Sequence, residues 1–420
     1  MEIFRNKPEI EVNVTSEIGK LNAVLLHRPG VEIERMTPGN AAEALYSDIL
    51  SKGIVDDEYK YFRGVFEKVT KVFYVSDLLE KVLGDDDLCN AMVTQSCAAE
   101  GCEFLVDELI QMSVKDIVRY LIEGFPYRKG KDPECFAERR YLLRPLYNLF
   151  FTRDASSSVY ERVLINSMSF DVRKRENLIY KAIFKYYFGC EVMNASEWEK
   201  TAHTEGGDVQ IGRSDLLCIG EGIRTNAKGI DFLAHTFSNR PKFNIIVQQL
   251  PKHPESFIHL DMVYTFLDRD RCMMYEPMLR KTDEFAGKST TWIEIDNGKI
   301  KYHECANMLE ALKKVGIEMD PVFCGGSDLW MQQREQWHSG ANFFALAPGK
   351  VIGYRRNVHT IEALDHAGFS VLNAEDVVDG RVDINDYNRC VVTFAASELP
   401  RAGGGARCMT MPINRDEVKW

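Results

Sequence analysis

Short apolar segments recur along this chain, and the gaps between them are long enough to hold a helix. The segments with the length and composition of strands are residues 23–26, 146–151, 163–165, 216–219, 245–247, 260–267, 342–347 and 391–394. Asp154, Asp208 and Asp261 lie 54 and 53 residues apart, each beside such a segment. A repeated strand-and-helix module arranged around an axis would bring these aspartates to one centre. The spacing therefore predicts an α/β fold with polar residues gathered near its middle.

Residues 76–140 interrupt this pattern, because their apolar side chains recur with helical spacing only. Ser113 and Asp116 have the spacing of a capping box that begins a helix at this point. The segment from Gly130 to Pro133 favours an exposed turn before the strands resume. We therefore predict an all-helical insertion at 76–140 in a catalytic α/β domain made of residues 1–75 and 141–420.

The formal charge of -11 disfavours a nucleic-acid partner, and the sequence has no run of Lys and Arg that would form a basic patch. A cationic small substrate suits this charge. Residues 1–7 lack the apolar core of a signal peptide, and no later segment approaches the roughly 18 uninterrupted apolar residues of a membrane helix. These features predict a cytoplasmic protein without a nucleic-acid or membrane partner. The 11 irregularly spaced cysteines then predict reduced thiols rather than a disulfide framework.

Cys408 is the first candidate nucleophile, because it follows the glycine run Gly403, Gly404 and Gly405 near the C-terminus. Glycines allow the backbone to bend and a substrate to approach closely, and the apolar residues after Cys408 favour a strand that fixes the sulfur. Cysteine is also among the most buried residue types. On position alone, a structural role therefore remains open.

Three polar segments could supply partners for this cysteine. Residues 204–208 place Glu205 and Asp208 on either side of two glycines, which predicts a sharp turn with acids at its edge or a plain surface turn. In residues 258–263, strand alternation predicts His259 and Asp261 on one face, either as a site or as a satisfied core histidine. Residues 148–154 place polar side chains around aromatic ones, as at a strand end.

Taken together, these segments resemble those of the arginine deiminases in the guanidine-modifying enzyme superfamily. The matching residues are 16–21, 26–30, 148–154, 205–208, 259–261, 340–342, 347–349 and 404–412, in family order over nearly the whole chain. The resemblance implies a pseudo-fivefold α/β propeller of ββαβ-type modules with a helical insertion. It also implies hydrolysis of free L-arginine to L-citrulline and ammonia.

The resemblance assigns the catalytic roles. A guanidinium is permanently charged, so its binding needs carboxylates, here Asp154 and Asp261. Cys408 as thiolate would attack the central carbon, expel ammonia and leave a thiouronium-type intermediate that water hydrolyses. His259 would protonate the leaving ammonia and then activate water, while Glu205 holds the guanidinium. The carboxylates should raise the pKa of the Cys408 thiol and of His259 in the empty site, so the thiolate should form mainly on substrate binding.

The resemblance also places the substrate-binding contacts. Arg173 and Arg224 would meet the α-carboxylate of arginine through their forked guanidinium groups, and Asn148 and Phe151 complete this set. A solvated surface position is the alternative for Arg173, which lies in a basic cluster. No metal or other cofactor is implied, and a homo-oligomer, most simply a dimer, is expected.

Two departures from the family pattern stand out. Arg401 is followed by Ala402 and Gly403, where the family usually has a second arginine, and Ala155 follows Asp154, where the family tends to have proline. Related activities remain open, namely hydrolysis of agmatine or methylarginine, amidino transfer, or arginine binding without catalysis. Arg173 and Arg224 argue against agmatine, because agmatine lacks the carboxylate that they would bind.

Overall fold

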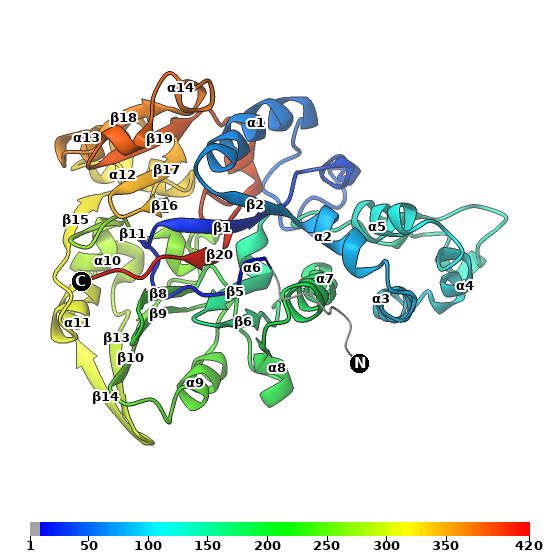
Figure 1. Ribbon diagram of the computed structural model, residues 1–420, viewed down its shortest axis with the longest axis horizontal. Helices are drawn as coiled ribbons and strands as arrows, with labels where there is room; N and C mark the ends of the chain where they lie inside the picture. Colours follow the sequence, from blue (N-terminus) through cyan, green and yellow to red (C-terminus); the bar gives the residue numbers. More distant parts are fainter. Residues whose placement is uncertain (1–8) are drawn as a thin grey trace.

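The computed structural model describes residues 9–420, so the expectation that residues 1–7 carry no signal peptide falls outside the described residues. The C-terminal strand β20 (Met411–Arg415) pairs antiparallel with β1 (Leu21–Leu26), and β1 pairs parallel with β2 (Lys71–Tyr74). Figure 1 shows β20, in red, beside β1, in blue. The last strand thus fastens the end of the chain to its beginning, directly after Cys408.

Four further sheets of three to five strands complete the β-structure of the domain. They consist of β5 (Ser156–Val159), β6 (Arg162–Ile165) and β7 (Val192–Met193); β8 (Val209–Arg213), β9 (Leu216–Glu221), β10 (Phe243–Gln249), β13 (Thr290–Asp296) and β14 (Lys299–Cys305); β11 (Tyr264–Phe266), β12 (Arg271–Met274) and β15 (Asp320–Phe323); and β16 (Phe344–Ala347), β17 (Lys350–Tyr354), β18 (Ser370–Asn373) and β19 (Cys390–Phe394).

Four sheets repeat one arrangement: an antiparallel pair, then a helix, then a strand that joins the pair in parallel. In the fifth sheet the strand after the helix is β18, and β19 pairs in parallel with both β17 and β18. The connecting helices are α1 (Lys52–Val69), α7 (Glu176–Ala182), α9 (Ala227–Thr236), α11 (Met308–Lys314) and α13 (Val358–His366). Parallel neighbours need such a crossover, whereas antiparallel neighbours need only a tight turn. The mixed α/β architecture predicted from the sequence is therefore confirmed, and Figure 1 shows the sheets distributed around the middle of the main body.

Two predicted strands are wrong in whole or in part. Residues 146–151 form turns, and side-chain hydroxyls satisfy their carbonyls in place of a neighbouring strand: Tyr46 donates to Tyr147, and Tyr180 donates to Leu149. In the segment 260–267, the strand covers Tyr264–Phe266, whereas Leu260–Met262 is a 3-10 helix. The strand alternation predicted for His259 and Asp261 is therefore also wrong.

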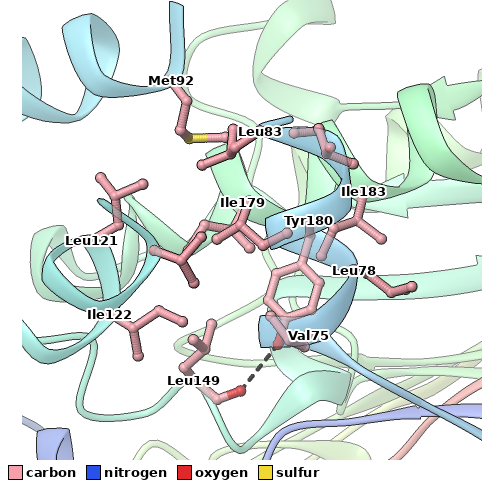
Figure 2. Close-up of a cluster of buried hydrophobic side chains, with 14 of the residues drawn as sticks. Val75, Leu78, Leu83, Met92, Leu121, Ile122, Leu149, Ile179, Tyr180 and Ile183 are labelled. Carbon is pink, nitrogen blue, oxygen red and sulfur yellow. Dashed lines mark hydrogen bonds between the residues drawn. The ribbon is translucent and has the colours of Figure 1, made fainter. Parts of the chain in front are cut away.

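The helical region projects from the sheets (Figure 1). Its helices are α2 (Val75–Val82), α3 (Asp86–Glu100), α4 (Val106–Leu109) and α5 (Val114–Glu123), and the strands β3 (Phe125–Pro126) and β4 (Tyr141–Leu143) follow. Ser113 accepts a hydrogen bond from the backbone N–H of Asp116, as predicted for the start of α5. Figure 2 shows side chains of α2, α3 and α5 packed with Ile179 and Tyr180 of α7 in one buried cluster. The helical region therefore shares its hydrophobic core with α7, the helix that follows Arg173 in the chain.

The remaining α-helices are α6 (Thr152–Ala155), α8 (Ala195–Trp198), α10 (Glu276–Arg280), α12 (Leu329–Trp337) and α14 (Ala374–Val378). All 11 cysteines are free thiols in the structure. Within residues 9–420, no helix has both the length and the apolar character needed to span a membrane.

Candidate active site

A cavity of about 330 Å³ brings together residues from distant parts of the sequence. Among the residues singled out above, its lining includes Asn148, Phe151, Asp154, Arg173, Arg224, His259 and Cys408. Glu205 and Asp261 lie behind this wall, fully buried, in contact with His259 and Cys408. All nine predicted site residues are thus in or directly behind one cavity.

Cys408 lies in the turn that precedes β20, and Asn342 holds this turn in place. The Asn342 side-chain N–H donates to Cys408 Sγ at 3.2 Å, and its Oδ1 accepts from the backbone N–H of Arg407 at 2.8 Å. Gly405 packs so closely against Asn342 that a Cβ at this position would clash with it. Asn342 lies in a segment that matches the family pattern, but it is not among the nine predicted site residues, because no step of the expected reaction required an amide at this position.

Asp261 faces the sulfur of Cys408 from behind, with its Oδ2 3.8 Å from Sγ. The same oxygen accepts a hydrogen bond of 2.8 Å from Arg407, which also binds Glu17 through two further hydrogen bonds. Burial raises the pKa of Asp261, and Arg407 opposes this effect. Arg407 directly precedes the candidate nucleophile in the sequence, and that adjacency is the signal that could have identified it.

Asp154 belongs to the cavity wall through the short helix α6, and it already has a guanidinium partner. Arg173 Nη1 lies 2.6 Å from Asp154 Oδ2, and the rest of the Arg173 guanidinium binds Glu176 at 3.0 and 2.9 Å. The three side chains are buried, so these charges have little solvent to compensate them. Arg173 is therefore an interior residue, which removes the alternative of a solvated surface position.

Glu205 connects the second predicted arginine to the histidine. Its carboxylate lies 3.0 Å from His259 Nε2 and 3.3 Å from Arg224 Nη1, and it accepts from the backbone N–H of Ser169 at 3.1 Å. Burial acts to raise the pKa of Glu205, but Arg224 and His259 outweigh it and lower the pKa to about 2. Glu205 is consequently an anion at neutral pH.

His259 and Cys408 both acquire raised pKa values, as the sequence predicts. For His259, burial opposes the charged form, but the hydrogen bond to Glu205 and the charges of Asp154 and Asp208 raise the pKa to about 9. Burial, followed by the charges of Asp261 and Asp154, raises the pKa of the Cys408 thiol well above its ordinary value. At neutral pH the empty site therefore combines an imidazolium with a neutral thiol.

Close contacts of two glycines and hydrogen bonds to backbone carbonyls position the side chains that line the cavity. Gly207 packs against the ring of His259, and Gly404 packs against the ring of Phe151, so a side chain at either position would displace the ring. Asn148 donates from its amide to the carbonyl of Ala44 at 2.8 Å, so this donor is already engaged. Tyr180 fixes the neighbouring carbonyl of Leu149, which Figure 2 shows as a dashed line.

Metal-ligating side chains do not gather elsewhere in the described part of the chain: no group of three or more His, Cys, Asp or Glu residues there is arranged to hold a metal ion. The grouping around Cys408 instead provides a nucleophile, an acid and several carboxylates for a cationic ligand.

The sequence of this chain matches the family model described as arginine deiminase over residues 43–415. The chain belongs to the arginine deiminase family. Two curated relatives in this family are the arginine deiminases of Limosilactobacillus fermentum, 30% identical over 433 residues, and Listeria innocua serovar 6a, 31% identical over 431 residues. In both cases the match covers 97% of this chain and 99% of the relative.

Two solved structures share the fold at low sequence identity. The N-terminal domain of ArgZ, an arginine dihydrolase from the ornithine-ammonia cycle in cyanobacteria, was solved with product bound; it matches with a TM-score of 0.53, 13% identity and coverage of 94% of this chain and 98% of that one. Unliganded AgrE matches with a TM-score of 0.52, 14% identity and coverage of 94% and 40%. These likenesses concern the fold, whereas family membership rests on the sequence matches.

Proposed function

We propose that this member of the arginine deiminase family hydrolyses free L-arginine to L-citrulline and ammonia through a covalent intermediate on Cys408. One observation carries the proposal: a buried thiol, an imidazolium and three carboxylates lie in or directly behind the wall of one cavity that two arginines also line. A guanidinium suits the carboxylate end, and an α-carboxylate suits the arginines.

Substrate binding is the first step of the proposed mechanism. The substrate guanidinium replaces Arg173 as the partner of Asp154 and brings its positive charge close to Cys408. Burial and then the charges of Asp261 and Asp154 raise the pKa of the Cys408 thiol, and the positive charge of the substrate lowers this pKa again. The Cys408 proton passes to bulk water as the substrate enters, so the thiolate is generated where its target is already positioned.

Two chemical steps follow. The thiolate forms an S–C bond to the central guanidinium carbon, and the C–N bond of the tetrahedral adduct breaks as His259 donates a proton to the departing ammonia. His259 is then neutral and takes a proton from a water molecule that attacks the thiouronium carbon. The S–C bond of the resulting adduct breaks, its hydroxyl proton passes to the sulfur to restore the thiol, and the ureido group of citrulline remains. Glu205 keeps His259 oriented through the 3.0 Å contact.

We also propose that the five sheets are the blades of a pseudo-fivefold α/β propeller, with residues 76–140 inserted as a helical unit between 1–75 and 141–420. The repeated strand arrangement and the pairing of β20 with β1 support the closed ring. The helices α2 to α5 support the inserted unit. A dimer in solution and a cytoplasmic location remain predictions of the sequence.

The decisive experiment measures ammonia and ureido-product release, with arginine or agmatine as the substrate, for the wild-type protein and a C408A variant in metal-free buffer. We expect turnover of arginine and none in the variant. Turnover of agmatine instead would contradict the assignment of Arg173 and Arg224 to the α-carboxylate. Saturable arginine binding without turnover in the wild-type protein would contradict the enzymatic proposal and favour arginine binding alone.

A further inference from the structure

The mouth of the cavity carries a carboxylate that the catalytic proposal leaves unused. Glu255 lines the cavity on the 3-10 helix η6 (Glu255–Phe257), and its side chain is exposed. Among residues 9–420, Glu255 has no hydrogen-bond or ion-pair partner. Asp154, the other carboxylate in the lining, is paired with Arg173. An unpaired anion thus lines a cavity whose wall also carries the cations Arg173 and Arg224.

Trp337, the last residue of α12, lines the same cavity and is 48% exposed. Its neighbour Gln336 accepts a hydrogen bond from the hydroxyl of Ser256 at 2.8 Å and donates to the Ser256 carbonyl at 2.9 Å. These reciprocal bonds fasten η6 to α12. Glu255 and Trp337 therefore belong to one wall whose position is fixed by buried hydrogen bonds.

Free arginine carries three charged groups, and the residues discussed so far address two of them. The guanidinium meets the acids beside Cys408, and the α-carboxylate meets Arg173 or Arg224. The α-ammonium requires an acceptor or an aromatic face, and it must lie within a few bonds of the carboxylate. A carboxylate beside a tryptophan provides both, because an ammonium is attracted to an anion and to the face of an indole ring.

We propose that Glu255 and Trp337 form the subsite for the α-ammonium group of the substrate, and thereby select amino acids over guanidino acids that lack this group. The inference rests on the proposed function, because it takes the substrate to be a guanidino amino acid. The proposed subsite adds a second criterion for substrate selection to the one that Arg173 and Arg224 impose. Arg173 and Arg224 discriminate against agmatine, which has an amine but no carboxylate. Glu255 and Trp337 discriminate against 5-guanidinopentanoate, which has a carboxylate but no amine.

The test compares kcat/KM for arginine and for 5-guanidinopentanoate in the wild-type protein, in E255Q and in W337L. We expect E255Q to lower kcat/KM for arginine about fivefold, mainly through KM, and to leave 5-guanidinopentanoate unchanged, since an accessible ion pair contributes modestly. W337L should act in the same direction. The matched control is E304Q, which removes an exposed carboxylate from β14, outside the cavity lining.

If E255Q lowers kcat/KM equally for both substrates, Glu255 shapes the cavity wall and does not contact the ammonium, which would overturn the inference. An unchanged kcat/KM for arginine in E255Q would also overturn it. Calorimetric binding of the two ligands to C408S and to the C408S/E255Q double variant gives the same comparison without turnover. Failure of the proposed function would appear as absent wild-type turnover. Failure of the subsite would appear as an affinity ratio between the ligands that E255Q does not change.

Discussion

Arg173 and Asp154 form a buried ion pair of 2.6 Å in the cavity wall, so the ligand-free site holds one of its own guanidinium groups against a carboxylate assigned to the substrate. Arg173 remains anchored to Glu176 by two further bonds. In the proposed mechanism, substrate binding exchanges one guanidinium partner of Asp154 for another. This exchange keeps the buried carboxylate paired in both states, which avoids the cost of an isolated buried charge.

Arg173→Lys should therefore weaken arginine binding. A lysine cannot form the bidentate contact with Glu176 and meet a carboxylate at the same time. We expect KM for arginine to rise about 10- to 100-fold, which corresponds to about 1.4–2.8 kcal/mol. R162K, at an exposed pair with Glu191, serves as the control. An unchanged KM in steady-state kinetics would contradict the substrate-binding role.

Asn342→Ala should lower kcat more than it raises KM. The side chain positions the sulfur of Cys408 and the backbone of Arg407, and it is not among the residues that line the cavity. Loss of these contacts leaves the nucleophile less well oriented, for which we expect about a tenfold fall in kcat. N373A is a surface control. A rise in KM alone would show that Asn342 supports binding rather than the chemical step.

Arg407→Met should destabilise the fold. Arg407 bridges Glu17 and Asp261, and its removal leaves two buried carboxylates without their cation. Breaking one side of a buried ion-pair network costs about 3–5 kcal/mol in free energy of unfolding. Urea unfolding measures this loss, and the double variant R407M/E17Q should recover part of it. Additive losses in the double variant would show that the two side chains do not stabilise one another.

The sequence predicted the site better than the local backbone around it. The resemblance to the arginine deiminases placed Cys408, His259 and Glu205 in one group, whereas each segment taken alone left a structural reading open. The strand predicted around His259 was wrong, since Asp208 accepts from the backbone N–H of Leu260 at 2.9 Å and thereby satisfies it without a neighbouring strand. Such long-range side-chain-to-backbone bonds leave no periodic signal in the sequence.

The sequence also did not predict which charged residues pair with one another. Arg173 was predicted as a ligand for a carboxylate, and its bond to Asp154 depends on how η4 (Asp171–Arg173) packs against α6. Arg407 was passed over because the adjacent cysteine accounted for the motif. The strands β1, β9, β10 and β19 were predicted correctly because short continuous apolar runs favour buried strands.

The thiol of Cys408 should remain protonated in the ligand-free protein at neutral pH, because burial and the charges of Asp261 and Asp154 raise its pKa. The difference in thiolate absorbance between wild type and C408A isolates this group from the other cysteines. We expect no difference signal below about pH 8.5, the ordinary pKa of a free cysteine. Titration of the thiol well below neutral pH would contradict its generation on substrate binding.

The alkaline limit of activity should follow His259. Its pKa is raised to about 9, chiefly by Glu205 acting against burial, so the imidazolium that donates to ammonia is present below this pH and lost above it. We expect kcat/KM for arginine to fall as pH rises through about 9. In E205Q the hydrogen bond to a charged carboxylate is lost, and the fall should move toward the ordinary histidine value of about 6.5.

The contribution of His259 to stability has the same sign: it is fully present below about pH 6.5 and lost as pH rises through about 9. Parallel pH profiles of kcat/KM and of thermal unfolding for wild type and E205Q separate the two effects, with E199Q as a surface control. An alkaline limit that stays in place in E205Q would show that another group sets it.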